Sequence, residues 1–277
     1  MPAVHVDDLR KRYGEYEALR GVSFEIREGE VFSLLGPNGA GKTTTIEILE
    51  GYRRRDAGTV SVLGVDPART TRDWRGRIGV VLQSSAMYEN ISVRESLALF
   101  AGYYERPRPV DEVIGVVGLE EKAEALVRRL SGGQRRRLDF GLALVGDPEL
   151  IFLDEPTTGF DPAARRNAWG TIRSLRDLGK TILLTTHYLD EAEQLSDRVA
   201  VLREGRIVAT GTPAELTKTP ETEIRYREDG KEVILRTEEP TRALAELTAR
   251  ALEQGRELEG LEVRRPTLEE VYLELTE

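Results

Sequence analysis

A glycine-rich segment near the N-terminus directly follows an apolar run. Residues 36–44 read GPNGAGKTT, and the run Val31–Leu35 precedes them. The spacing G-x-x-x-x-G-K-[ST] is that of a phosphate-binding P-loop, whose glycines let backbone N–H groups turn inward towards a phosphate. Lys42 would supply a cation for the β- and γ-phosphates, and the Thr43 hydroxyl could ligate Mg²⁺. The segment Thr44–Glu50 reads as a helix whose N-terminus adds partial positive charge beneath the anion.

This loop predicts nucleotide binding. A glycine-rich turn that binds nothing is the weaker alternative, because every fixed position of the motif is filled. The residues assigned to the nucleotide in this loop are Gly36, Pro37, Asn38, Gly39, Ala40, Gly41, Lys42, Thr43 and Thr44.

Two adjacent carboxylates end a second apolar run, Leu150–Leu153. Asp154 suits the acid that holds Mg²⁺ in nucleotide sites. Successive side chains of a strand point to opposite faces, so both acids reach one site only if the strand stops there, and Pro156 indicates that it does. Glu155 could then accept a proton from an attacking water. An acidic turn after a strand is common by itself, but downstream of a P-loop it favours nucleotide hydrolysis.

A second glycine-rich segment, Leu-Ser-Gly-Gly-Gln at 130–134, precedes an expected helix. A serine and two glycines at a helix start can form an anion site, although alone they would read as a plain glycine-rich cap. The three arginines at 135–137 lie near the helix start, where cations are slightly unfavourable. A contact with acidic groups across an interface is one interpretation of them, and a solvated face is the favoured one.

The elements that must position these residues alternate up to about residue 218. Five short apolar runs predict buried parallel strands of an α/β sheet with helices between them: Val31–Leu35, Ile78–Leu82, Leu150–Leu153, Thr181–Thr185 and Arg198–Leu202. The best-marked helix follows Asp161, which can cap it, and ends at Gly179.

Two regions depart from this alternation. The first thirty residues predict a small antiparallel hairpin layer, Ala3–Leu9 and Leu19–Ile26. Residues from about 90 to 145 carry helical spacing and no strand runs, so we expect a compact helical insertion with helices at Val93–Tyr104, Val110–Val117 and Glu120–Arg129.

The tail from residue 221 to 277 is more acidic than the rest and predicts a small appended α+β domain. Two strands, Glu223–Arg227 and Glu232–Arg236, precede a helix at Thr241–Glu253. A strand at Leu261–Arg265 and a second helix, opening at Pro266 with Thr267 and Glu270 as a capping box, follow. We therefore expect two domains, 1–220 and 221–277.

Composition limits the function classes. The chain has 277 residues, 39% of them apolar and 32% charged, with a net charge of −9 and no cysteine. The negative charge argues against a general nucleic-acid footprint, and the lack of cysteine excludes disulfides and thiolate metal sites. Apolar runs are shorter than the roughly 18 residues that span a bilayer, and the N-terminus lacks signal-peptide features. Work at a membrane would then require a partner.

The order of these motifs, from the P-loop to Thr185-Thr186-His187, resembles an ABC-type ATPase, the nucleotide-binding domain of ATP-binding cassette transporters. The resemblance covers residues 3 to about 218 and implies a P-loop NTPase core that binds ATP and Mg²⁺. Asp154, Gln83 and Thr43 would hold the metal, and Glu155 would be the base. Lys42, Gln83 and His187 would complete the catalytic group.

The resemblance also assigns residues outside the P-loop. Tyr13 would stack on adenine, although it could be a packed surface aromatic. Gln83 would touch Mg²⁺ and water and sense the membrane partner, unless it is a solvated loop residue. His187 would contact the γ-phosphate, with a satisfied core histidine as the alternative.

A further group implies a second subunit. Ser131, Gly132 and Gly133 would meet the γ-phosphate held by the opposite subunit, and Asp161 would lie in a loop that contacts that subunit. One chain cannot obviously bring its own P-loop and serine-glycine site to one phosphate, whereas two chains packed head-to-tail can. The resemblance therefore implies an ATP-dependent homodimer.

Three segments are similar in sequence to ABC-2-type drug-resistance exporters: Gln83–Glu95, the segment from Arg128 and the tail from Arg265. That implies an ATPase at the cytoplasmic face of the membrane, powering export through a separate permease docked beside Gln83–Ser92. The alternative is a soluble ABC-type ATPase acting on nucleic acid or the ribosome; direct nucleic-acid binding is not expected. The tail and Gln83–Glu95 disfavour an importer.

Overall fold

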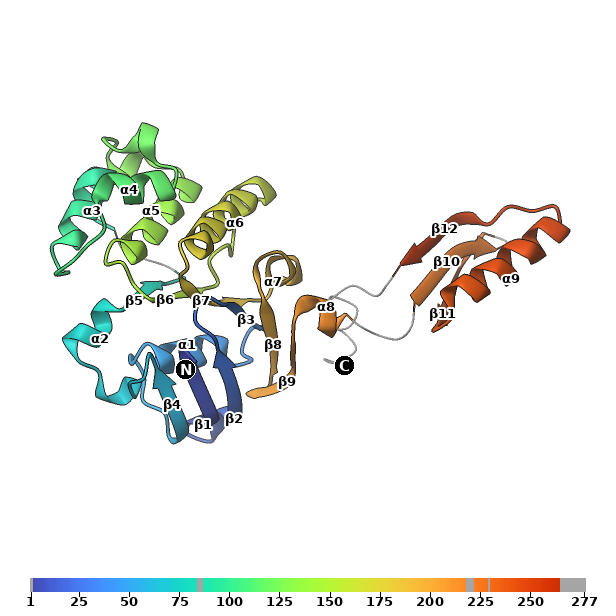
Figure 1. Cartoon of the computed structure of the whole chain (residues 1–277), viewed down its shortest axis with the longest axis horizontal. Coiled ribbons are helices and arrows are strands. Elements are labelled where there is room, and N and C mark those ends of the chain that lie inside the picture. The colour runs from blue at the N-terminus through green and yellow to red at the C-terminus, as the bar shows by residue number, and fades with distance from the viewer. Residues whose placement is uncertain (1, 84–86, 218–221, 229, 265–277) are drawn as a thin grey trace. The chain divides into compact units, whose positions relative to one another are not determined.

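The computed structural model describes residues 2–83, 87–217, 222–228 and 230–264. It forms two compact units, residues 1–210 and 211–277 (Figure 1). The expected helix from Pro266, with its capping box, lies outside the described residues. Domain limits at 220 and 221 stay a prediction.

In the described part of the first unit, six strands form the core sheet in the order β5-β6-β7-β3-β8-β9. Their bounds are β3 (Val31–Leu35), β5 (Ile78–Val81), β6 (Leu150–Asp154), β7 (Thr181–Thr186), β8 (Arg198–Arg203) and β9 (Arg206–Gly211). β5 pairs in parallel with β6, β6 with β7, and β3 with both β7 and β8. The five predicted strands are therefore confirmed, and their carboxyl ends lie at one edge of the sheet.

The sheet separates two apolar cores, and successive residues of β6 show why. Ile151 and Leu153 pack into the core shared with α5 (Gly132–Leu144) and α6 (Pro162–Asp177). Leu150 and Phe152 point the other way. Alternation along a strand thus places one half of a uniformly apolar run on each face.

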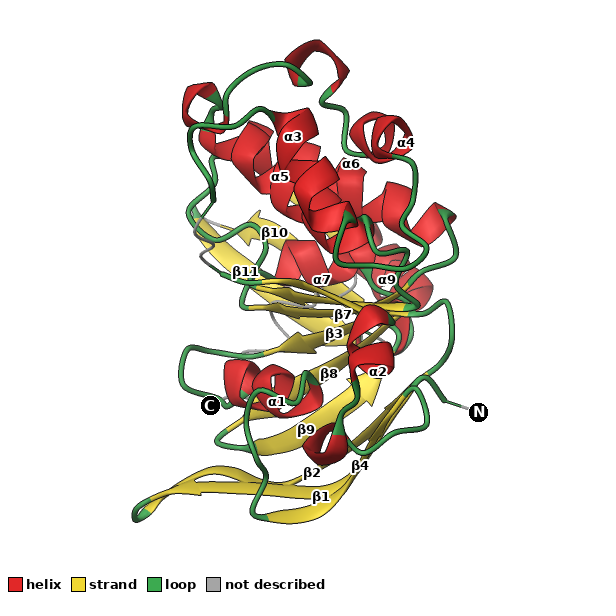
Figure 2. Ribbon diagram, turned by 90° about the vertical axis from the view of Figure 1, so that its left-hand side faces the viewer, coloured by secondary structure: helices red, strands yellow, loops and turns green. Residues whose placement is uncertain are grey.

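The helical insertion covers one of these faces. Figure 2 shows α3 (Val93–Ala101), α4 (Val110–Val116), α5 and α6 on one side of the sheet, and α1 (Lys42–Leu49) on the other. The expected helix at Glu120–Arg129 was wrong. Two short 3-10 turns, Glu120–Lys122 and Val127–Arg129, occupy it. Backbone hydrogen bonds from Val93 N to Ala125 O (3.1 Å) and from Val127 N to Ile91 O (2.9 Å) replace helical ones.

The N-terminal layer is larger than the predicted hairpin. β1 (Val4–Tyr13) lies between β2 (Tyr16–Ile26) and β4 (Ala57–Val62), and both pairings are antiparallel. β9 was also missed, because its burial alternates between exposed and intermediate and so gives no apolar run. The elements that complete this unit are a 3-10 turn at Pro67–Arg69, α2 (Arg72–Gly76) and α7 (Leu189–Leu195).

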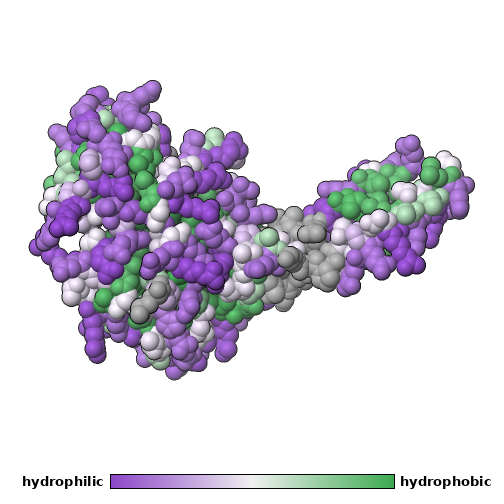
Figure 3. All heavy atoms as spheres, in the orientation of Figure 1, coloured by the Kyte–Doolittle hydropathy of each residue, from purple (hydrophilic) through white to green (hydrophobic). Residues whose placement is uncertain are grey.

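The second unit contains α8 (Pro213–Leu216), β10 (Thr222–Glu228), β11 (Lys231–Thr237), α9 (Pro240–Glu253) and β12 (Glu259–Arg264). The strands form an antiparallel sheet in the order β11-β10-β12, which confirms a small α+β domain. The Glu223 carboxylate is buried and forms ion pairs with Arg225 (2.8 Å), Arg236 (3.2 Å) and Arg264 (3.4 Å). Apolar side chains also reach the surface of this unit, Leu252 among them (Figure 3).

Candidate active site

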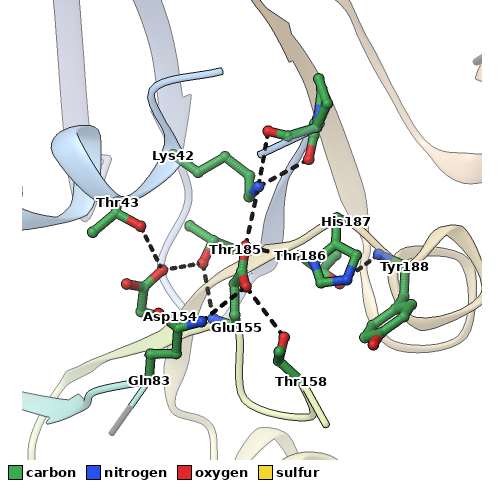
Figure 4. Close-up of polar contacts among 12 residues, drawn as sticks. Lys42, Thr43, Gln83, Asp154, Glu155, Thr158, Thr185, Thr186, His187 and Tyr188 are labelled. Atoms are coloured by element: carbon green, nitrogen blue, oxygen red, sulfur yellow. Dashed lines mark hydrogen bonds and ion pairs between the residues drawn. The ribbon is translucent and has the colours of Figure 1, made fainter. Parts of the chain in front are cut away.

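Four loops meet at the carboxyl edge of the core sheet. Gly36 follows β3, Gln83 lies just beyond β5, Glu155 follows β6 and His187 follows β7. Because parallel strands end at the same edge, residues far apart in the sequence approach one another there (Figure 4).

The P-loop leaves room only for glycine at two of its positions. A Cβ on Gly36 would lie 2.3 Å from the carbonyl oxygen of Leu202. Gly41 has a φ of 108°, and its Cβ would lie 2.8 Å from the carbonyl oxygen of Ala18. Since α1 begins directly after Gly41, these close contacts hold the start of the helix against β2 and β8.

Lys42 is the buried cation of the site, with only 4% of its side chain exposed. Its Nζ donates hydrogen bonds to the carbonyl oxygens of Gly36 (2.9 Å) and Pro37 (3.2 Å). The same atom forms an ion pair with Glu155 Oε1 at 3.1 Å. The loop lysine and the carboxylate after β6 are therefore in direct contact.

Asp154 lies at the end of β6 and accepts two hydroxyl hydrogen bonds. Thr185 Oγ1 donates to Asp154 Oδ1 at 2.5 Å, and Thr43 Oγ1 donates to the same oxygen at 3.5 Å. Burial raises the pKa of the Asp154 carboxyl in spite of these hydrogen bonds. A nearby cation would favour the ionised form of this acid.

Glu155 reaches the same site because the chain turns sharply after β6. Its φ is 44°, the left-handed region, and its N–H donates to Thr185 Oγ1 at 3.0 Å. Glu155 Oε2 accepts hydrogen bonds from Thr158 Oγ1 (3.2 Å) and Gln83 Nε2 (3.4 Å). Burial would raise the pKa of this carboxyl, but the hydrogen bond and charge of Lys42 outweigh it and lower the pKa. Glu155 is therefore ionised at neutral pH.

His187 lies beside this carboxylate, with its Nδ1 3.5 Å from Glu155 Oε1. The ring packs against Tyr188 at 4.1 Å between centroids. Just beyond it, the buried Glu191 on α7 accepts hydrogen bonds from Thr157 Oγ1 (2.7 Å) and Trp169 Nε1 (3.0 Å). This carboxylate, which sequence reasoning missed, ties the histidine loop to the loop after β6.

The remaining predicted site residues, Ser131, Asp161 and Tyr13, make their contacts with residues outside this cluster. Ser131 caps α5 and forms a capping box with Gln134. Asp161 caps α6 through the N–H groups of Ala163 and Ala164. Both side chains are thus at helix starts, as the sequence predicts.

Tyr13 lies at the end of β1 with 40% of its surface exposed. The Arg53 guanidinium carbon is 5.2 Å from its ring centroid and Lys11 Nζ is 5.7 Å away. An exposed aromatic face flanked by cations is suited to a stacked, negatively charged ligand.

The comparisons with known proteins agree with this geometry. The family model described as "ABC transporter" matches residues 19–158, and a model of an "ABC transporter domain-containing protein-like, C-terminal domain" matches residues 210–267. The chain belongs to the ABC transporter family. It is an ATP-binding subunit of an ABC transporter, an ATPase, as the motif order predicts.

This ABC ATPase is similar in sequence to two named ATP-binding proteins. It is 39% identical to the daunorubicin resistance ATP-binding protein DrrA3 of Streptomyces coeruleorubidus, over 99% of this chain and 96% of that one. It is 46% identical to the Nod factor export ATP-binding protein I of Paraburkholderia xenovorans, over 77% of this chain and 72% of that one.

Solved structures of ABC ATPases share the fold. One, an ATP-binding subunit of an ABC transporter, has a TM-score of 0.73 and 25% identity and covers 99% of this chain and all of its own. Another, a dimer of the ATP-binding cassette MJ0796 in a post-hydrolysis state with ADP and Pi, has a TM-score of 0.66 at 25% identity. It covers 76% of this chain and 98% of its own.

Proposed function

We propose that this ABC ATPase powers export through a separate membrane subunit. The observation that best supports export is the similarity to DrrA3 over 99% of the chain, because this similarity includes the C-terminal unit as well as the ATPase unit. The similarity to a Nod factor export ATPase supports the same direction of transport. The cargo would be selected by the membrane subunit.

In this proposal ATP binds at the P-loop, with adenine on Tyr13 and the β- and γ-phosphates on Lys42. The Lys42 ammonium now pairs with Glu155, so a phosphate would compete with that carboxylate for the same cation. Glu155 would then be free to accept the proton of an attacking water as the bond to the γ-phosphate breaks, giving ADP and inorganic phosphate. Gln83 and His187, which both lie beside Glu155, would hold the water and the γ-phosphate.

Mg²⁺ fits the residues between the P-loop and β6. The Thr43 hydroxyl, the Gln83 amide oxygen and the Asp154 carboxylate are hard oxygen ligands of the kind that Mg²⁺ prefers. Asp154 is also a buried acid whose ionised form a divalent cation would stabilise. When bound, the ion would neutralise charge on the phosphate oxygens.

A head-to-tail homodimer would complete each site. Ser131 is exposed at the start of α5, a helix of 13 residues whose first N–H groups can bind an anion. Ser131, Gly132 and Gly133 of one copy would contact the γ-phosphate on the other, and Asp161 would lie in the loop between copies. The dimeric solved relative supports the formation of a dimer.

A separate permease would anchor the ATPase at the cytoplasmic face of the membrane. None of the described helices is long and apolar enough to cross a bilayer. Leu82, directly before Gln83, and Tyr88, within the expected docking segment Gln83–Ser92, are exposed apolar side chains. A partner seated there would contact the same loop that carries Gln83.

The test is co-purification of the tagged full chain from membranes of its native host. We expect a multi-span membrane protein to co-purify and to stimulate ATP hydrolysis in proteoliposomes. ATPase activity that responds to nucleic acid, with no membrane protein recovered, would contradict export and favour the soluble alternative.

A further inference from the structure

Arg136 is buried, although a solvated face was the favoured interpretation of the three arginines after the glycine pair. Only 7% of its side chain is exposed. Its neighbours differ: Arg135 bonds Glu89 Oε1 at 3.2 Å, and Arg137 bonds the carbonyl oxygen of Gly118 at 2.6 Å, both as surface contacts. Burying one arginine among three is costly unless its donors are satisfied.

The Arg136 guanidinium binds three backbone carbonyls from two other segments. Nε donates to Pro156 O at 2.8 Å, Nη1 donates to Leu82 O at 2.5 Å, and Nη2 donates to Asp154 O at 3.4 Å. The carboxylate of Asp139, one turn further along α5, lies 3.7 Å from Nη1. A planar fork of donors can reach three acceptors at once, which a lysine ammonium at the end of a flexible stem cannot do in the same geometry.

These carbonyls adjoin the two residues that are proposed to handle water. Leu82 directly precedes Gln83, while Asp154 and Pro156 flank Glu155 on both sides. Glu155 has a left-handed φ of 44°, which costs a non-glycine residue about 1–3 kcal/mol and persists only where its surroundings hold it. Arg136 bonds the residue on each side of this strained position.

The same arginine belongs to the helix that Ser131 caps, five residues further on. Because a helix moves as a rigid element, a shift of Ser131 would be transmitted through Arg136 to both loops. We propose that Arg136 is a positioning residue for ATP hydrolysis, which holds Gln83 and Glu155 in place relative to the start of α5. This rests on the proposed function, in which Ser131 contacts the ATP of the other copy. Arg136 would thereby couple the two sites of the dimer.

The experiment compares Arg136→Lys with Arg137→Lys in the purified full chain. Arg137 is a matched control, because it lies on the same helix and also bonds a backbone carbonyl, but outside the active-site loops. We expect Arg136→Lys to lower kcat by about tenfold or more, the range for lost bonds to a charged group, and to reduce the Hill coefficient for ATP towards one. The KM for ATP and the affinity for nucleotide should change less than about twofold, since neither depends on the Arg136 bonds.

Wild-type kcat in Arg136→Lys would overturn the proposal, and so would equal losses in both variants. A second variant, Arg136→Ala, allows a chemical rescue experiment. Millimolar guanidinium ion should restore part of its kcat, whereas a merely destabilised protein would show no such recovery. A failure of ATP hydrolysis in the wild-type chain would count against the proposed function instead.

Should both variants fail to fold, hydrogen exchange of the wild-type chain decides. We compare the ADP form with the dimer bound to a non-hydrolysable ATP analogue. Residues 131–140, 80–83 and 154–158 should gain protection together. Protection of 131–140 with no change in the two loops would overturn the proposal.

Discussion

The two predicted anion-binding helix starts, at α1 and at α5, differ in how the chain itself surrounds them. α1 begins inside a closed network, in which the buried Lys42 contacts Glu155 and the P-loop carbonyls. α5 begins at the exposed Ser131, whose hydroxyl accepts from Gln134 of its own helix. One predicted anion site is thus surrounded by groups of its own chain, whereas the other is presented outward. This difference is what a two-copy site requires.

Among the changes that test this comparison, Glu155→Gln should have the largest effect on ATP hydrolysis. Removing the proposed general base should lower kcat by about 10²–10⁴-fold. ATP binding should remain, because the P-loop and Lys42 are intact, and the ATP-bound dimer should accumulate. Single-turnover kinetics and size-exclusion chromatography with ATP measure both effects. Hydrolysis at the wild-type rate would remove Glu155 as the base.

Ser131→Arg tests the outward half. We expect hydrolysis to fall by about 10²-fold or more, since a bulky cation would obstruct the proposed interface with the γ-phosphate. The affinity of the monomer for ATP should not change, because Ser131 has no contact with Lys42 in the described residues. Titration with a fluorescent ATP analogue measures that affinity. A weaker monomer would contradict the assignment of Ser131 to the other copy.

Thr185→Val should lower kcat by less, and its effect should be confined to the closed network around α1. The Thr185 hydroxyl donates to Asp154 and accepts from the N–H of Glu155. Its loss leaves a buried acid and a strained backbone position less well held, so kcat should fall about tenfold. Steady-state kinetics would show this, and Thr185→Ser, which retains the hydroxyl, is the matched control. Equal kinetics in the two variants would contradict the account.

The smallest expected effect is on stability, and it comes from the titration of Glu50. Glu50 is the C-cap residue that follows α1. Burial, with help from Asp154 and Glu47, raises its pKa from 4.5 to about 8. A raised folded pKa means that the native state binds the proton more tightly, so the free energy of unfolding should fall as pH rises from about 5 to 8. We expect a loss of about 1 kcal/mol between pH 6.5 and 7.5 in the nucleotide-free chain. Urea unfolding of Glu50→Gln should lack this slope, and an unchanged slope would exclude Glu50.

Much of the fold could be predicted because its core strands are buried along their whole length and rich in apolar residues. β3, β6 and β7 carry no alternation, which is typical of strands buried on both faces. β4 and β9 were missed because their burial is partial and their residues mixed. The wrong helix at Glu120–Arg129 shows the opposite failure, in which backbone pairing with a distant segment overrode local helical spacing.

The proximity of several candidate site residues was predictable from the motifs, while their roles stay predictions. Lys42, Asp154 and Glu155 do meet, and Gln83 and His187 join them. Arg136 and Glu191 were not predictable, because each acts through partners that only the folded chain brings near: backbone carbonyls for Arg136, and a threonine and a tryptophan for Glu191. No spacing rule encodes such contacts.

The most direct test of the two-copy site mixes two inactive variants. Lys42→Ala removes the P-loop cation and Ser131→Arg removes the outward half, so each should be inactive alone. A mixed dimer would contain one site built from the intact P-loop of one copy and the intact Ser131 of the other. The account predicts that mixing restores ATP hydrolysis to a measurable fraction of the wild-type rate. Activity no higher than that of the separate variants, in mixtures shown to form dimers, would contradict it.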